Sequence, residues 1–196
     1  MDTRTDRAAP TAWAEQLEDS RGLGGLAGQL RGPLAAVMGQ TAKRALQGRA
    51  VGHAVHPLAV QLPLGALTSA IVLDMWGHGS SWRESRRLVA TACLGALPSI
   101  LTGMAEWLDA DERTQRVGVA HAAVNAGSTL VLVASLAARS GRGAGPTSTA
   151  GMALSIAAAL GFSVGGFLGG HMSLARKYAT HDAPRDFEGA HSGAAG

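Results

Sequence analysis

Cysteine, aromatic and charged residues are all scarce in this chain of 196 residues. It has one cysteine, 4% aromatic residues and 16% charged residues, whereas about 25% of the residues of a typical soluble domain are charged. The single cysteine, Cys93, has no partner for a disulfide within the chain, and its place in an apolar run indicates a buried side chain. The shortage of charge argues against an ordinary soluble domain and favours a membrane protein with polar ends.

The sequence also lacks the motifs of several common functions. Its net charge of +3 comes from Arg and Lys residues that flank apolar runs without forming one basic face, so no nucleic-acid partner is expected. No GxxxxGK[ST], CxxC or HExxH motif is present. The GxSxG spacing of GFSVG at 161–165 lies inside an apolar run, and no catalytic residue is predicted. Several acidic residues precede the first apolar run, so we expect no secretory signal peptide. Whether the protein is an enzyme stays open.

Four apolar runs are each long enough to form a membrane-spanning helix. A helix needs about 20 residues to cross a hydrocarbon core about 30 Å thick, and lipid selects helices because every backbone polar group needs an internal partner. Short polar connectors join the runs, which predicts antiparallel neighbours. The predicted fold class is all-α, an integral membrane up-down-up-down four-helix bundle, with spans at 57–77, 88–108, 118–138 and 150–170.

Polar segments flank the four-helix transmembrane domain, which is predicted over 51–176. Residues 1–50 should hold an amphipathic surface helix over 33–46, with Pro33 at its first position and Leu34, Val37 and Met38 on the face toward the acyl chains. A helix packed on the bundle is the alternative. Residues 177–196 have the composition of a disordered tail. Seven Lys and Arg residues near the span ends on one side, against five on the other, favour cytoplasmic termini in a cell inner membrane.

Antiparallel threading brings histidines from distant parts of the chain to one membrane face. His121 and Asn125 are spaced i, i+4 and therefore share a helix face, and Pro57 suits a first helical position that would orient His56. Imidazoles from different helices can hold a transition metal ion or both axial positions of haem iron. The predicted cofactor-binding residues are His53, His56, His121, His171 and Asn125, and the predicted metal ligands are His56, His121, His171 and Glu106.

Structural interpretations of these residues stay open. A histidine at a span end can hydrogen-bond to headgroups or backbone carbonyls without binding a cofactor. Asp74, near the far end of the first span, suits a loop-capping carboxylate or a proton-transfer group. The fourth span contains overlapping GxxxG spacings, which suit close helix packing, a partner helix or a flat cofactor. Its glycines are Gly161, Gly165, Gly166, Gly169 and Gly170.

Four motifs resemble a bacterial family of predicted membrane proteins called domain of unknown function 2231. They are HAVHPLAVQLPLG, GMAEWLD, HAAVNAG and GGFLGGHM, within 52–176. The resemblance implies a compact four-span protein, some members of which are associated with Rieske-type iron–sulfur proteins. The family pattern falls on His53, His56, Pro57, Glu106, His121, Asn125 and the Gly169, Gly170 pair before His171. Glu106 stands where the family more often has Asp, which would shift a ligand role to Asp109 or change its reach.

Two functional hypotheses follow, from different classes. In the first, the histidine cluster binds haem or a transition metal ion for electron transfer, with a Rieske-type or other redox protein as partner. In the second, the protein is a structural or assembly subunit without a cofactor, and the glycines of the fourth span dock a partner helix or a second copy of the chain. A small transporter and a soluble bundle are further alternatives.

Overall fold

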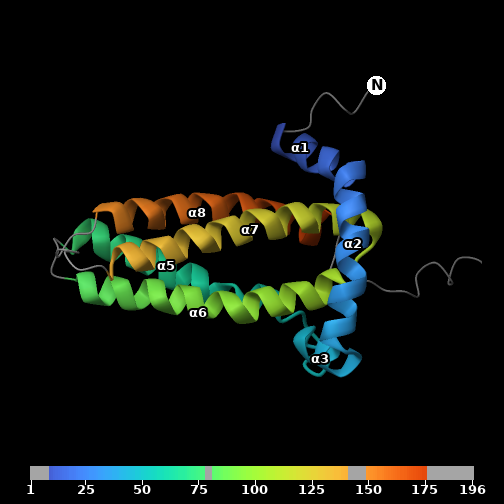
Figure 1. Cartoon of the computed structure of the whole chain (residues 1–196), viewed down its shortest axis with the longest axis horizontal. Coiled ribbons are helices and arrows are strands. Elements are labelled where there is room, and N and C mark those ends of the chain that lie inside the picture. Colours follow the sequence, from blue (N-terminus) through green and yellow to red (C-terminus); the bar gives the residue numbers. More distant parts are fainter. Residues whose placement is uncertain (1–8, 78–80, 141–148, 176–196) are drawn as a thin grey trace, which may run out of the picture.

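The computed structural model describes residues 9–77, 81–140 and 149–175 and is helical throughout its regular structure (Figure 1). The predicted disordered tail, 177–196, lies outside the described residues. In chain order the helices are α1 (Ala9–Glu18), α2 (Arg21–Met38), α3 (Gln40–Leu46), α4 (His56–Ala59), α5 (Gln61–Trp76), α6 (Trp82–Trp107), α7 (Glu112–Ala138) and α8 (Thr149–Gly170), followed by a π-helical turn, η1 (His171–Ala175).

The predicted membrane bundle is confirmed. Four helical segments of the described chain are long and apolar enough to cross a membrane, namely His56–Trp76, Trp82–Trp107, Glu112–Ala138 and Thr149–Leu174, and they run antiparallel in sequence order (Figure 1). Many of their large apolar side chains point outward. Leu94, Leu130 and Leu160 are 68%, 71% and 66% exposed, which suits contact with lipid because a surface this apolar is unfavourable in water.

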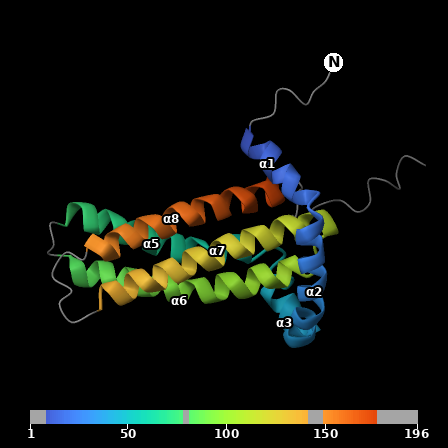
Figure 2. The same cartoon turned by 45° about the horizontal axis from the view of Figure 1, so that its top comes forward.

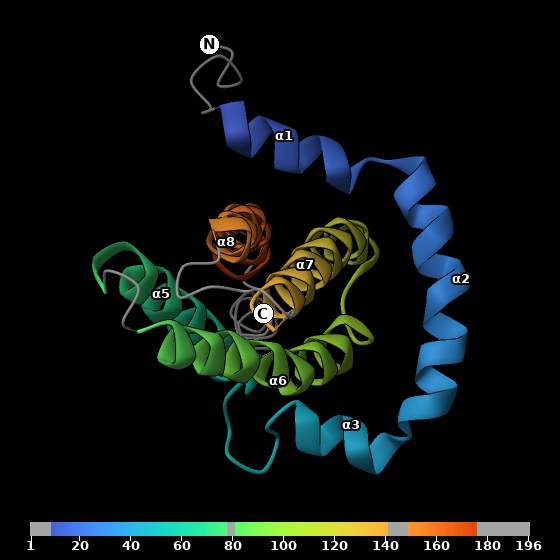
Figure 3. The same cartoon turned by 60° about the vertical axis from the view of Figure 1, so that its left-hand side comes forward.

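The bundle consists of two helix pairs. Helix α5 packs mainly against α6, and α7 mainly against α8, with fewer contacts between the pairs. Figure 3 views the four helices nearly end-on, with α5 beside α6 and α7 beside α8. Alanines dominate the buried centre, among them Ala70, Ala92 and Ala158. Small side chains let helix backbones approach closely, which is how helices associate where lipid supplies no hydrophobic driving force.

The first span is interrupted near its start. Proline lacks an N–H group, so Pro63 donates no hydrogen bond to the carbonyl of Ala59. The helical hydrogen bonding is interrupted at this point, so α4 ends at Ala59 and α5 begins at Gln61. Pro57 lies in the first turn of α4, as the sequence predicted. This short helix places His56 at the end of the bundle.

An N-terminal arm of three helices wraps one end of the bundle. Helix α2 crosses that end at a steep angle to the spans, and α1 and α3 continue the arm on either side (Figures 1 and 2). The single amphipathic helix predicted over 33–46 is wrong in its boundaries. Pro33 lies inside α2, and Gly39, at φ +61°, separates α2 from α3. A positive φ is left-handed backbone that glycine adopts without steric cost, and it ends a helix.

Candidate functional site

His56 is the first residue of α4, and its side chain packs against α6. Its Nδ1 lies 3.0 Å from the carbonyl oxygen of Ser99 and 3.3 Å from Oγ1 of Thr102. A carbonyl oxygen can only accept, so Nδ1 carries the proton and Nε2 keeps its lone pair. The ring lies over Gly103, where an added Cβ would come within 2.9 Å of the imidazole. Glycine at this position therefore makes room for the histidine.

His121 has the same arrangement in the other helix pair. Its Nδ1 donates to the carbonyl oxygen of Gly165 at 2.8 Å. Its Nε2 then accepts a hydrogen bond from Nδ2 of Asn125 at 3.0 Å, so the predicted i, i+4 pair does share one helix face. A Cβ on Gly165 would collide with the Asn125 amide, and one on Gly169 would press on His121 at 3.3 Å. These two glycines of α8 leave room for the side chains of Asn125 and His121 of α7.

The two imidazoles face each other across the boundary between the helix pairs. Their ring centroids are 6.4 Å apart and the ring planes are inclined by 75°. His56 is anchored to a carbonyl of α6 and His121 to a carbonyl of α8. In metal-binding histidines, a hydrogen bond from the ring nitrogen that does not bind the metal fixes the tautomer and the ring orientation.

The remaining predicted site residues are His53, Glu106 and His171, and they differ in burial. His53 is exposed in the loop before α4, and Glu106 is buried in α6 at 7% exposure. His171 is buried at the start of η1, where its Nε2 lies 2.8 Å from Oε1 of Glu18. Within the described ranges, no three His, Cys, Asp or Glu side chains are grouped so that they could hold a metal ion. The structure thus brings together His56, His121 and Asn125 of the predicted set.

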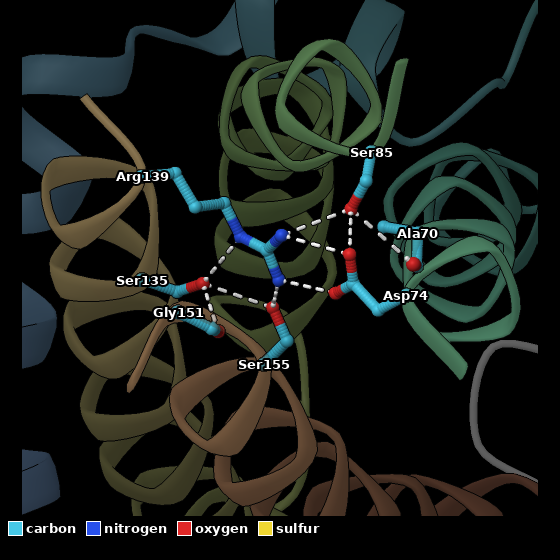
Figure 4. A network of polar contacts seen from close by, with 7 residues as sticks. All are labelled: Ala70, Asp74, Ser85, Ser135, Arg139, Gly151 and Ser155. Atoms are coloured by element: carbon cyan, nitrogen blue, oxygen red, sulfur yellow. Dashed lines mark hydrogen bonds and ion pairs between the residues drawn. The ribbon is translucent and has the colours of Figure 1, made fainter. Parts of the chain in front are cut away.

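A second polar centre lies at the opposite end of the bundle. Arg139, at the C-terminal end of α7, is 5% exposed and forms a bidentate ion pair with Asp74 of α5, at 3.0 and 2.5 Å. Its remaining guanidinium hydrogens reach three serines, one each from α6, α7 and α8 (Figure 4). The distances are 3.0 Å to Ser85, 3.2 Å to Ser135 and 3.1 Å to Ser155.

The hydrogen bonds around Arg139 are complete. A guanidinium has five N–H donors, and five acceptors surround this one. Ser85 donates to Asp74 at 2.6 Å, and Ser135 donates to the carbonyl oxygen of Gly151 at 2.7 Å. A buried charge is costly unless it is paired and fully hydrogen-bonded. We therefore assign this network to structure: it ties all four spans together at one end.

Sequence reasoning treated Arg139 as a loop cation and considered no partner for Asp74. A signal for the pair was nevertheless present. Asp74 stands near the end of the first span and Arg139 directly after the third, so antiparallel threading puts these opposite charges at the same face. Glu18 was likewise missed as the partner of His171, because nothing in the polar N-terminal segment marks it as buried.

Helix α3 is fixed to the end of α6 by polar contacts. Lys43 Nζ and Gln47 Nε2 donate to the carboxylate of Asp109 at 2.6 and 2.7 Å, and Gln47 also reaches the carbonyl oxygen of Ala105 at 2.9 Å. Partial burial raises the pKa of Asp109, but the hydrogen bonds from Gln47 and Lys43 and the charges of Lys43 and Arg49 outweigh it. The net result is a pKa below the ordinary value.

Comparison with protein families agrees with this architecture. The family model described as predicted membrane protein (DUF2231) matches residues 52–182, which include all four spans. The chain belongs to this family. Searches of curated proteins and of solved structures gave no match. The DUF2231 assignment confirms the resemblance drawn from the histidine and glycine motifs. It identifies a membrane protein without naming an activity.

Proposed function

We propose that this DUF2231 protein binds a redox-active metal group, haem iron in the first place, between His56 and His121. The observation that carries the proposal is the matched pair of imidazoles. Each donates Nδ1–H to a backbone carbonyl and keeps the Nε2 lone pair, and the two rings come from different helix pairs, 6.4 Å apart.

The number of protein ligands favours haem over a bare ion. Zinc and most other transition ions take three or four protein ligands, whereas haem iron needs only two axial ligands because the porphyrin supplies the rest. His56 and His121 are two, and the described residues add no third. The boundary between the helix pairs is also the less extensively packed one, which suits entry of a flat group. When bound, such a group supplies one-electron transfer.

Asn125 controls access to His121. Its amide caps the Nε2 lone pair at 3.0 Å, so the side chain has to turn away before Nε2 can bind a metal. Asn125 then acts as a positioning residue that holds the ring in its tautomer until the ligand arrives. Replacing Asn125 by Ala should speed loading without abolishing binding, whereas replacing His121 should abolish it.

The experiment is an absorption spectrum of the full chain purified in mild detergent from cells supplied with a haem precursor, together with metal analysis and a haemin titration. We expect a haem band that His56→Gln and His121→Gln each remove. His53→Gln is the matched control, because this exposed histidine should leave the band unchanged. Absence of both a haem band and stoichiometric metal, with no binding of added haemin, would refute the proposal.

We further propose a cell inner membrane location with both termini on the cytoplasmic side. Seven Lys and Arg residues near the span ends on one side, against five on the other, support this orientation by the positive-inside criterion. A redox protein such as the Rieske-type proteins suggested by the family resemblance would then meet the histidine face from the cytoplasm. Labelling of single cysteines placed in the loops of a Cys93→Ala variant tests this orientation.

A second candidate function, a subunit that docks a partner helix or a second copy, is supported by the outward glycines of α8. An added Cβ at Gly166 or Gly170 would meet no atom within 4 Å, and the two glycines are one turn apart. Gly166→Leu should therefore break an assembly and leave the monomer folded. If that variant alters the assembled state while His56→Gln and His121→Gln change nothing, the second candidate replaces the first.

A further inference from the structure

The junction of α2, α3 and α6 encloses a hollow of about 170 Å³. Arg31 lines it from α2, Lys43 from α3, and Leu108 and Asp109 from the end of α6. Gly39, the residue between α2 and α3, forms part of its wall. The turn at this glycine, with its positive φ, creates the hollow, because a continuous helix would pass by the end of α6 without enclosing space.

The charge in this hollow is net positive. Asp109 is already paired with Lys43 at 2.6 Å and lies 3.9 Å from Arg49. Arg31 also lines the hollow, and no carboxylate in the described parts of the chain forms an ion pair with it. A guanidinium with free donors next to an ammonium group is suited to a phosphate, which accepts hydrogen bonds from a planar fork.

The hollow lies at the level of lipid headgroups. Leu108 and Asp109 directly follow Trp107, which ends a candidate span, and tryptophans at span ends typically lie at the membrane interface. Helix α2 crosses this end of the bundle (Figure 1). A ligand in the hollow would therefore reach it from the bilayer surface.

Apolar side chains lie on a second face of α2. Leu26, Leu30 and Val37 are 43%, 40% and 88% exposed, and with Pro33 they follow the i, i+4, i+7, i+11 spacing of a single helix face. Acyl chains beside this face would cover apolar surface that the protein leaves uncovered. The residues of α2 that line the hollow, Arg31, Ala35 and Met38, lie on a different face of the same helix. The apolar face thus places α2 at the membrane surface without forming part of the hollow.

We infer that the hollow binds the phosphate of an anionic phospholipid, with Arg31 as its principal donor and Lys43 as a second cation. Free phosphate shares the headgroup chemistry, but the hollow lies beside a span end at the level of the headgroups, so the lipid is the occupant that fits its position.

The test uses the full chain in nanodiscs made from equal amounts of phosphatidylcholine and phosphatidylglycerol, with retained lipid counted by native mass spectrometry. The wild-type protein should retain phosphatidylglycerol preferentially. Arg31→Gln should reduce that preference about fivefold, the effect of one cation at an anionic membrane surface, and Arg31→Lys should keep most of it. Arg21→Gln is the matched control, since it removes the same charge from the exposed start of α2, away from the hollow.

Three results would overturn the inference. Equal preference in the wild-type protein and Arg31→Gln would show that the hollow holds no headgroup. An equal loss in Arg21→Gln would show only general attraction between charges. A second arm titrates inorganic phosphate into lipid-free protein in a neutral detergent: tight binding there that depends on Arg31 and displaces phosphatidylglycerol would identify free phosphate as the occupant.

Discussion

Glu18 Oε1 and His171 Nε2 lie 2.8 Å apart, although 153 positions separate the two residues along the chain. Both residues are buried, Glu18 at 6% and His171 at 9% exposure, and the contact joins the end of α1 to the start of η1. The same helix is held by Trp13, which stacks on Phe167 of α8 with ring centroids 6.4 Å apart. The N-terminal arm is therefore part of the folded bundle.

Loss of His171 should release α1 from the bundle. Removing one member of a buried hydrogen-bonded pair leaves the other without that partner, so His171→Ala should lower the free energy of unfolding by about 1–3 kcal/mol. Thermal unfolding in detergent measures the loss, and limited proteolysis between α1 and α2 reports undocking. His53→Ala, at an exposed position, is the control. Unchanged proteolysis in His171→Ala would mean that Trp13 and its neighbours hold α1 without the pair.

Substitution of the buried Arg139 should strongly lower the stability of the protein. Arg139→Ala leaves Asp74 buried without its counter-charge, and breaking such a pair costs about 3–5 kcal/mol. Arg139→Lys should also destabilise the protein, because an ammonium group has three N–H donors and five acceptors surround this position. Arg86→Ala removes an exposed arginine that bonds Ser140 at 3.0 Å and should have little effect.

The double variant Asp74→Ala/Arg139→Ala decides whether the charge or the packing matters. If the unpaired carboxylate causes the loss, the double variant should unfold at a higher temperature than Arg139→Ala alone. Equal melting temperatures for the single and double variants would instead assign the loss to the serine contacts of the guanidinium.

Neighbouring glycines of α8 should respond in opposite ways. A methyl group at Gly165 would collide with the Asn125 amide, so Gly165→Ala should destabilise by about 1–3 kcal/mol and disturb the hydrogen bond to His121. At Gly166 the space is open, and Ala should stabilise the helix by up to about 1 kcal/mol through its higher helix propensity. Thermal unfolding of the two variants side by side tests this difference, and equal behaviour would contradict it.

Docking of α3 should weaken in acid. The pKa of Asp109 is lower in the folded protein than its ordinary value near 3.8, so its contacts contribute stability above that value and lose it as the pH falls through the folded pKa. The protection of the α3 amides, measured against their intrinsic exchange rate at each pH, should therefore fall on acidification below about pH 4. Asp109→Asn should exchange faster already at neutral pH and lose this acid dependence. An unchanged profile in Asp109→Asn would exclude the carboxylate as the cause.

The spans could be predicted because each is encoded locally. An apolar run of about 20 residues needs no distant partner to specify a membrane helix, and its antiparallel order was enough to bring His56 near His121. The arm was less predictable. Trp13, Ala14 and Leu17 of α1 are spaced for one helix face, but the surrounding charges suggested a solvent-exposed segment, and Gly39 breaks a pattern that looked continuous.

The polar partnerships were hidden for a different reason. Each joins residues whose burial is decided only when the helices pack, so Glu18 and Arg139 both looked like surface residues in the sequence. Chain order placed His171 at the same membrane face as the other histidines. In the structure its imidazole is instead bound by Glu18 of α1. Membrane level follows from chain order, whereas position around the bundle axis depends on packing.

The order of translation gives the Glu18–His171 contact a further consequence. A ribosome adds about 5–20 residues per second, so the 153 positions between the two residues correspond to a delay of roughly eight to thirty seconds. Throughout that time α1 lacks its contact with His171, although α7 and α6, against which α2 and α3 pack, are made earlier. Helix α1 therefore completes its docking only when the fourth span has been synthesised.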